Sequence, residues 1–384
     1  MNRNHTLRLL AASATMVCVC QTGTIRPGHA KEIAPPIPTS AAVTAPAAPA
    51  SAAALTAEEK TRIIDGVCRQ LNEAYVFPET AKKMEADLRE RQKQGAYDAV
   101  TDNKAFADAL TEHLRAVSKD KHLSVFYSPK PLPEDLGREP EGSPPAAVRE
   151  QQRRDMARTN FGFERVERLP GNVGYLDLRG FYAPDAAGET CAAAMTFLSH
   201  ADALILDLRR NGGGEPAMVA LVCSYLFDEG EEVHLNDIYD RPSDSTRQFW
   251  TLPTVPGKRL GRRPDVYVLT SSRTFSGAEE CTYNLKNTRR ATVIGETTGG
   301  GAHPGGPRRV NDHFGVWLPT GRAISPITKT NWEGTGVAPD IAVPADQALP
   351  LAHRKALEKA IARSQNDPER AEALKKVLAD LEKK

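Results

Sequence analysis

The chain has 384 residues, of which 40% are hydrophobic, and its 50 basic residues nearly balance its 49 acidic residues. This length is sufficient to bury more than one hydrophobic core. A net charge of +1 gives no sign of the basic surface that nucleic acids require, so we expect no nucleic-acid partner.

The first 30 residues have the pattern of a secretory signal peptide. Arg3 and Arg8 precede an apolar run over residues 9–20, and small residues offer a cleavage site after Ala30. The run is too short to cross a bilayer as a helix, so no integral membrane span is expected. A lipid-attachment cysteine within the run is the alternative, although no good lipobox precedes it. We therefore predict a periplasmic or secreted protein.

The next segments differ sharply in composition. Residues 31–56 are rich in alanine and proline and predict a flexible linker without a packed core. Residues 57–127 carry apolar side chains at helical spacing, for example Ile63 and Val67, and predict a small helical bundle. The polar stretch 128–158 is interpreted as a loop or linker.

Four short runs beyond residue 159 predict strands: VGYLDL, ALILDL, DVYVLT and ATVIGE. Helical segments separate them, so we expect βαβ units with a parallel sheet, an α/β core over residues 159–345. The charged tail, residues 346–384, has the pattern of a solvated helix.

A candidate nucleophile follows the run DVYVLT. Ser276 stands between this strand and a helix whose residues Ala278, Cys281 and Leu285 are expected to face inward. At a helix start, unpaired N–H groups and the helix dipole can stabilise an oxygen that becomes negative during acyl transfer. Ser276 with Glu279 three residues later is also an ordinary capping box, so the spacing alone leaves both interpretations open.

Two glycine-rich turns follow other predicted strands, at residues 211–214 and 299–301. Glycines allow a backbone N–H to approach a reacting carbonyl closely. Neither turn has the spacing of a Walker loop or a dinucleotide-binding loop, so no nucleotide cofactor is expected. Tight turns between a strand and the next element are the alternative explanation.

Four cysteines remain in the mature chain: Cys68, Cys191, Cys223 and Cys281. An even number in an exported protein permits disulfides, but their helical, apolar surroundings favour free buried thiols, and no bridge is assigned. The sequence lacks CxxC, HExxH and paired histidines at helical spacing, so we predict no metal site and no cofactor.

Four motifs, DLRRNGGG, RTFSGAEE, ATVIGETTGGG and NWEGTGVAPDI, occur in one order and at separations that resemble the carboxy-terminal-processing (tail-specific) serine peptidases. The resemblance covers about residues 57–345. It is closest to the branch that contains the tricorn core and the interphotoreceptor retinoid-binding protein repeats. It implies a crotonase-like core after a small helical domain, with no residues left for a PDZ module between them.

The two branches of this family differ in their catalytic base. Tail-specific enzymes use a lysine whose position matches Gly301, whereas the tricorn-like branch uses a histidine that matches His122. The resemblance therefore implies that His122 is the general base for Ser276. It also implies that Glu333 orients the histidine, although Lys121 replaces the serine that relays this contact in the branch.

The resemblance further implies an oxyanion hole formed by the backbone N–H groups of Gly213 and Gly277. Asp207 and Arg209 are expected to hold the first glycine-rich turn in shape. The expected function is a serine peptidase that cleaves a peptide or unfolded protein through an acyl-enzyme. The alternative is a non-catalytic module that binds a retinoid- or lipid-like ligand on the same fold. Cleavage specificity and oligomeric state do not follow from the sequence.

Overall fold

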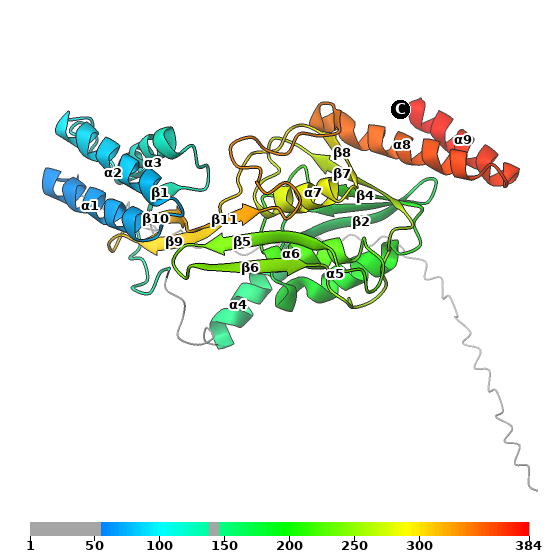
Figure 1. Ribbon diagram of the computed structural model, residues 1–384, viewed down its shortest axis with the longest axis horizontal. Helices are drawn as coiled ribbons and strands as arrows, with labels where there is room; N and C mark the ends of the chain where they lie inside the picture. The colour runs from blue at the N-terminus through cyan, green and yellow to red at the C-terminus, as the bar shows by residue number, and fades with distance from the viewer. Residues whose placement is uncertain (1–54, 138–145, 384) are drawn as a thin grey trace, which may run out of the picture. The chain divides into compact units, whose positions relative to one another are not determined.

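The computed structural model describes residues 55–137 and 146–383 (Figure 1). The predicted signal peptide and nearly all of the predicted linker lie outside these residues. In the part of the chain that is described, no helix combines the length and the apolar character needed to cross a membrane.

Three helices lie in the region where helical spacing predicts them: α1 (Ala57–Ala74), α2 (Pro78–Lys93) and α3 (Asn103–Ser118). Side-chain caps begin two of them. Thr56 forms a capping box at the start of α1, and the carboxylate of Asp102 accepts a hydrogen bond from the first turn of α3. These caps satisfy N–H groups that have no partner within the helix.

The core of these helices is completed by residues from much later in the chain. β1 (Ser124–Tyr127) follows α3 and pairs antiparallel with β10 (Phe314–Pro319), which in turn pairs with β9 (Gly305–Arg309). The buried cluster of the helices includes three side chains of β10: Phe314, Val316 and Leu318. The helical region therefore shares one hydrophobic core with this small sheet.

A six-stranded, mostly parallel sheet forms the centre of the remaining chain (Figure 1). Its strands, in spatial order, are β12 (Ile341–Ala342), β8 (Thr292–Gly295), β7 (Asp265–Thr270), β4 (Ala203–Asp207), β3 (Val173–Leu178) and β2 (Phe163–Leu169). All neighbours are parallel except β2 and β3. The four strands predicted from the sequence are β3, β4, β7 and β8. Every residue of β3 and β4 is buried, as expected for parallel strands covered on both faces.

Helices cover both faces of this sheet: α5 (Pro184–Leu198), α6 (Pro216–Ser224), α7 (Gly277–Asn287) and α8 (Ala348–Arg363). The last helix, α9 (Pro368–Glu382), packs against α8. Successive strand residues alternate between the faces, so Leu206 packs in the cluster with α5, α6 and α7, whereas Ile205 packs with α8. The tail is therefore not simply a solvated helix. Small side chains at helical spacing, Ala348, Ala352 and Ala356, let α8 lie close against the sheet.

A third sheet and one helix lie outside the sequence predictions. β5 (His234–Asp240) pairs antiparallel with both β6 (Ser245–Trp250) and β11 (Gly321–Ile324). α4 (Ala146–Ala157) occupies part of the stretch that was expected to be a loop. Nearly all its described residues are exposed, so it has no apolar face from which to predict a helix. Two single-turn 3₁₀ helices, Asn160–Gly162 and Ala345–Gln347, complete the described elements.

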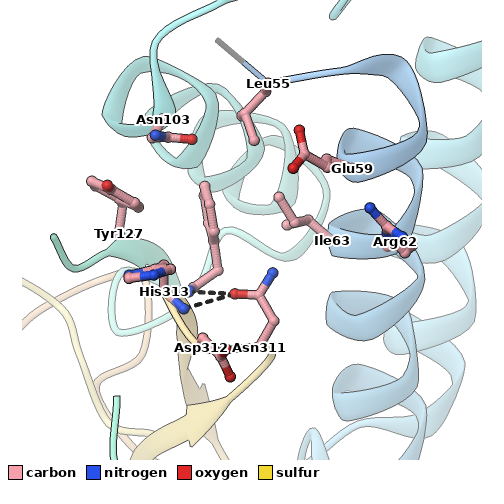
Figure 2. Close-up of a pocket in the computed structure, with 10 residues that line it drawn as sticks. Leu55, Glu59, Arg62, Ile63, Asn103, Tyr127, Asn311, Asp312 and His313 are labelled. Carbon is pink, nitrogen blue, oxygen red and sulfur yellow. Dashed lines mark hydrogen bonds between the residues drawn. The ribbon is translucent and has the colours of Figure 1, made fainter. Parts of the chain in front are cut away.

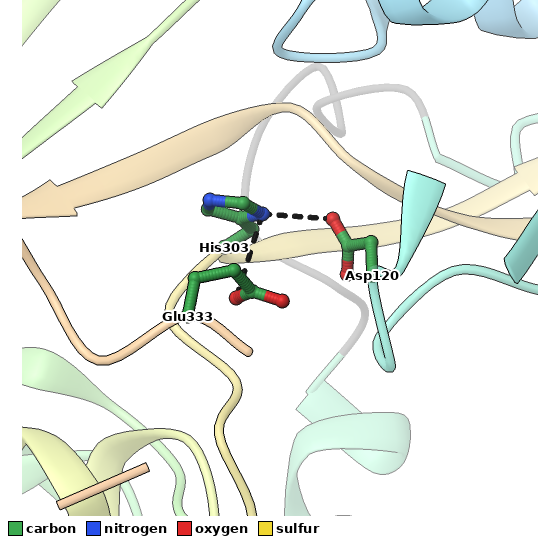
Figure 3. A group of neighbouring side chains, drawn as sticks. All are labelled: Asp120, His303 and Glu333. Carbon is green, nitrogen blue, oxygen red and sulfur yellow. Dashed lines mark hydrogen bonds and ion pairs between the residues drawn. The ribbon is translucent and has the colours of Figure 1, made fainter. Parts of the chain in front are cut away.

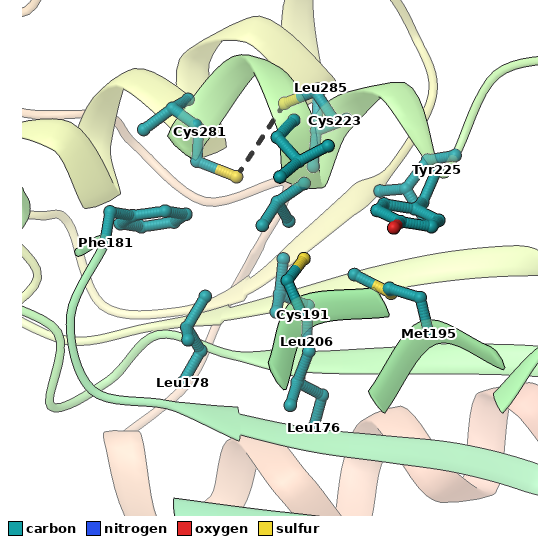
Figure 4. Packing of buried hydrophobic residues seen from close by; sticks show 14 of the residues in the cluster. Leu176, Leu178, Phe181, Cys191, Met195, Leu206, Cys223, Tyr225, Cys281 and Leu285 are labelled. Atoms are coloured by element: carbon teal, nitrogen blue, oxygen red, sulfur yellow. Dashed lines mark hydrogen bonds between the residues drawn. The ribbon is translucent and has the colours of Figure 1, made fainter. Parts of the chain in front are cut away.

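All four cysteines of the described chain are free and buried, as their apolar surroundings predict. Cys223 of α6 and Cys281 of α7 lie with their Sγ atoms 4.0 Å apart in the core beneath the sheet (Figure 4). Burial raises the pKa of Cys191, in the same core, to about 12. These thiols therefore act as small apolar side chains that pack α5, α6 and α7 together.

Candidate active site

The order of the parallel strands brings the sequence motifs together. β4, β7 and β8 are neighbours in the sheet, so their carboxyl ends lie at one edge. The first glycine-rich turn follows β4, Ser276 follows β7, and the second glycine-rich turn follows β8. The carboxyl ends of parallel strands are the usual location of ligand sites in α/β folds.

Ser276 has an unusual backbone conformation at the start of α7. Its φ is +54° and its ψ is −123°, whereas an ordinary N-cap residue is extended with negative φ. A positive φ is uncommon for a residue with a side chain, and such strain is concentrated at functional sites. The same sharp strand-to-helix turn presents the nucleophile in other serine enzymes. The backbone thus distinguishes Ser276 from a residue that only caps a helix.

Glu279 links the nucleophile turn to the second glycine-rich turn. This carboxylate is fully buried and accepts hydrogen bonds from the backbone N–H groups of Ser276 (2.9 Å), Gly300 (2.6 Å) and Gly301 (2.8 Å), and from the Thr298 hydroxyl (2.5 Å). Burial raises the pKa of Glu279, and the hydrogen bonds oppose this effect. The residue expected to complete a capping box therefore organises two loops of the site.

The first glycine-rich turn lies directly against the nucleophile. A Cβ atom on Gly213, whose φ is +104°, would come within 2.7 Å of both the Gly277 nitrogen and the Ser276 Cβ, so only glycine fits. The N–H of Gly213 donates to the Asn211 side chain at 2.8 Å. The next amide, that of Gly214, lies close to Gly277, because a Cβ on Gly277 would be 3.0 Å from the Gly214 nitrogen.

Asp207 and Arg209 hold this turn, as expected. The Asp207 carboxylate is buried, accepts the Tyr175 hydroxyl at 2.8 Å and forms an ion pair with the Arg209 guanidinium. Arg209 also donates to the carbonyl of Ala345 at 2.6 Å. These contacts brace the turn after β4 from the side of the sheet that α8 covers.

His122 reaches the nucleophile turn from the segment between α3 and β1. Its ring lies against the ring of Phe275, the residue before Ser276, with centroids 4.6 Å apart. Gly301 leaves room for it, since a Cβ there would be 2.7 Å from the His122 Cε1 atom. The structure therefore brings His122 to the residues on either side of the site.

The surroundings of His122 keep its imidazole neutral. Burial lowers the pKa of His122 to about 4, the Asp120 charge opposes this effect, and His303 adds to it. The Nδ1 atom is buried and has no hydrogen-bond partner among the described residues. A neutral imidazole with a free ring nitrogen can accept a proton.

Glu333 contacts a different histidine from the one expected. Its Oε2 accepts the backbone N–H of Ala302 at 2.5 Å and lies 3.5 Å from the Nδ1 atom of His303. No hydrogen bond joins it to His122 in the described structure, and its Oε1 is buried without a partner. Burial raises the pKa of Glu333 to about 7, against the effect of the neighbouring His303.

Asp120 and His303 are buried neighbours of the site that the sequence interpretation missed (Figure 3). Their side chains are 2.8 Å apart, Oδ2 to Nδ1. Together with Glu333 they offer three atoms within 4.8 Å of one another that could hold a metal ion. The Asp120 carboxylate already accepts from the Tyr75 hydroxyl, His303 and the His122 backbone, which is the pattern of a hydrogen-bonded ion pair. The position of Asp120 two residues before His122 could have indicated from the sequence that Asp120 belongs to the site. Nothing in the sequence around His303 indicated that it does.

Lys121, which departs from the pattern of the resembled branch, points to the second glycine-rich turn. Its ammonium group donates to the carbonyl of Gly299 at 2.5 Å. It thus joins the His122 segment to the loop that Glu279 organises.

A separate hollow lies between the start of α1 and the turn that joins β9 and β10 (Figure 2). Asn311, at this turn, accepts the backbone N–H groups of His313 and Phe314 at 2.9 and 2.8 Å. The mixed lining includes Glu59 and Arg62 of α1. Asn103 of α3 and Tyr127 of β1 also line it, and none of the residues assigned to the candidate site does.

A serine on a strained turn beside a neutral histidine is the arrangement of a serine hydrolase. The model of peptidase family S41 matches residues 172–343, and the model of the N-terminal domain of S41 peptidases in eukaryotic IRBP matches residues 50–164. The chain belongs to peptidase family S41.

Individual relatives are more distant. Carboxyl-terminal-processing peptidase 2 from chloroplasts of Arabidopsis thaliana is 26% identical over 186 residues, 47% of this chain and 35% of the relative. The chain thus matches about a third of the length of this curated relative. A solved peptidase-like protein from Parabacteroides merdae shares the fold, with a TM-score of 0.50 and 17% identity over 74% of this chain and 90% of that one. The solved structure of the photosystem II D1 C-terminal processing protease has a TM-score of 0.45 and is 18% identical over 76% of this chain and 94% of that one.

Proposed function

We propose that the protein is an exported serine peptidase that hydrolyses peptide bonds through an acyl-enzyme on Ser276. The observation that supports this most strongly is the positive φ of Ser276 in the turn between β7 and α7, with the ring of His122 against the ring of the preceding Phe275. A strained serine beside a neutral base serves no evident purpose in a protein that only packs or binds.

In the proposed reaction, the Oγ of Ser276 attacks the carbonyl carbon of the substrate while His122 accepts the hydroxyl proton. The tetrahedral intermediate collapses when His122 returns this proton to the leaving amine. Water then attacks the acyl-enzyme with the same histidine as base, releases the carboxylic acid product and restores the Ser276 hydroxyl.

The oxyanion would be held by backbone amides at the start of α7 and in the first glycine-rich turn. Gly277 is the first donor, because it stands at the helix N-terminus directly after the nucleophile. Gly213 is the second donor if its N–H exchanges the Asn211 side chain for the substrate oxygen, and the neighbouring amide of Gly214 is the competing candidate.

The proposal includes a crotonase-like core over residues 159–345 after a helical domain over 57–127, and export directed by residues 1–30. Glu333 would act on His122 through intervening groups, since its nearest ionisable neighbour is His303. The proposed substrate is a peptide or an unfolded protein, as the name of the carboxyl-terminal-processing relative suggests.

The test is the intact mass of the protein after exposure to a serine-directed fluorophosphonate. Wild type should gain one adduct, and Ser276→Ala and His122→Ala should gain none. Ser272→Ala is the matched control, because Ser272 is an exposed serine in the same loop and should leave labelling unchanged. A folded wild type without an adduct would contradict the proposal, and binding of a hydrophobic fluorophore would then test the alternative of a ligand-binding module.

A further inference from the structure

A chain of polar contacts connects Glu333 with His122, and Figure 3 shows its part from Glu333 through His303 to Asp120. The His122 backbone N–H donates to Asp120 Oδ1 at 3.0 Å, Asp120 Oδ2 accepts from His303 Nδ1 at 2.8 Å, and Glu333 Oε2 lies 3.5 Å from the same Nδ1. These residues come from three separate turns of the chain. The contact between Glu333 and His122 is thus indirect, through two intermediate side chains.

Asp120 needs these contacts because its side chain is only 1% exposed. A buried carboxylate without a partner destabilises the folded state by several kcal/mol, on the order given for uncompensated buried charges. Within the described residues its one ion pair is with His303. The Tyr75 hydroxyl donates to the same oxygen at 3.2 Å, and burial raises the pKa of Tyr75, so this hydroxyl remains a donor.

His303 stands between two carboxylates and is itself nearly buried, with 8% of its side chain exposed. We assign the hydrogen to its Nδ1 atom, because the Asp120 carboxylate 2.8 Å away is an acceptor. The ring also makes an edge contact with Phe77, with centroids 5.2 Å apart. Packing and hydrogen bonding therefore fix the orientation of the imidazole.

We propose that Asp120 and His303 are positioning residues of the active site, in which the His303 ring donates a hydrogen bond to the buried Asp120 carboxylate and Asp120 holds the turn that presents His122 to Ser276. Neither residue touches the reacting atoms. This inference rests on the proposed peptidase function. It assigns to His303 the link to Glu333 that the resemblance placed directly on His122.

Two substitutions separate the hydrogen bond of His303 from the rest of its ring. His303→Asn retains a donor close to the position of Nδ1 but lacks the imidazole ring that packs against Phe77, whereas His303→Ala removes both. The measurement is the rate constant of fluorophosphonate labelling from pH 3 to pH 9 (about one point per half unit), with unfolding followed by circular dichroism. His113→Asn is the matched control, because His113 is a partly buried histidine that bonds Tyr97 away from the site.

His303→Ala should slow labelling at neutral pH by roughly 10- to 100-fold, the range observed for partners that orient a reactive group. His303→Asn should stay within about threefold of wild type at neutral pH, since the hydrogen bond is retained. Its acid limb should move to higher pH, because His303 lowers the pKa of His122 and the substitution removes this effect while the opposite effect of Asp120 remains. A residue with only a structural role would not move this limb.

Labelling of His303→Asn and His303→Ala at the wild-type rate and with the wild-type pH profile would overturn the inference. If His303→Ala does not fold, the inference is tested by the acid limb of the labelling profile of His303→Asn alone. Loss of wild-type labelling on addition of a chelator would also overturn it, since a metal ion would then occupy the cluster. An unlabelled wild type overturns the proposed function, whereas a labelled wild type with unaltered variants overturns only the positioning role.

Discussion

The nucleophile side of the site and its histidine side are built in different ways. Ser276 and the two glycine-rich turns follow three adjacent parallel strands, and backbone hydrogen bonds to Glu279 tie the nucleophile turn to the second glycine-rich turn. His122, His303 and Glu333 come from three separate turns, and Asp120 links them: its carboxylate accepts from the His122 backbone N–H and from His303, which lies 3.5 Å from Glu333. The first arrangement depends on the geometry of the sheet, whereas the second depends on charge. Substitutions at a buried acceptor should therefore break the nucleophile side, and pH should act on the histidine side.

The largest effect is expected at Glu279. In Glu279→Gln, the amide NH₂ group replaces one of the two oxygens that accept hydrogen bonds from four donors, so a donor then faces a donor. We expect the free energy of unfolding to fall by about 3 kcal/mol and fluorophosphonate labelling to be lost. Urea unfolding measures the change. Glu296→Gln is the control, because Glu296 accepts two backbone N–H groups nearer the surface and should change stability by less than about 1 kcal/mol. A similar loss in both variants would contradict the assigned role.

The next effect is the dependence of labelling on pH. Since burial lowers the pKa of His122 to about 4, the ring stays neutral down to that pH, and the rate should fall roughly tenfold per unit only below it. The free energy of unfolding should also fall as the pH falls. The unfolded chain binds the His122 proton more readily than the folded chain, so His122 destabilises the fold increasingly from about pH 6.5 toward pH 4.

A rate profile with its acid limb near the ordinary histidine pKa would show that water reaches His122 and that burial does not govern it. Glu333→Gln should be measured in parallel, because burial raises the pKa of that carboxyl to about 7. Any limb in that range that disappears in Glu333→Gln belongs to Glu333 and not to His122.

The smallest effect concerns backbone strain at Ser276. Both Ser276→Ala and Ser276→Gly remove the nucleophile, but only glycine adopts a φ of +54° without strain. We expect the glycine variant to be more stable than the alanine variant by about 1 kcal/mol, the lower end of the range for strained backbone. Chemical denaturation of the two variants measures the difference. An alanine variant that is equally stable or more stable would show that the turn relaxes when the hydroxyl is absent.

The nucleophile side was largely predictable from the sequence, because its signals are local. The four central strands are continuous apolar runs, and each motif follows its strand directly. The antiparallel sheet of β5, β6 and β11 was missed, since β6 is mostly exposed and lacks a clear alternation. The helices were predicted, but not the contribution of β10 to their core, because that contact joins residues roughly two hundred positions apart.

The histidine side was only partly predictable. His122 was expected from a matched motif, and the structure brings it to Phe275 and Gly301, but the position of Glu333 beside His303 had no local signal. The bond from Gly213 to Asn211 depends on the path of a single turn, which composition does not encode. Contacts between side chains of distant loops are decided by tertiary packing.

The space at Gly301 has a consequence for which side chains can stand beside the His122 ring. A side chain there would meet the Phe275 ring at 2.3 Å and the His122 ring at 2.7 Å. A lysine at this position and a histidine at His122 thus compete for one volume. If His122 is the base, as we propose, a lysine at position 301 cannot be added beside it unless the Phe275 ring also moves.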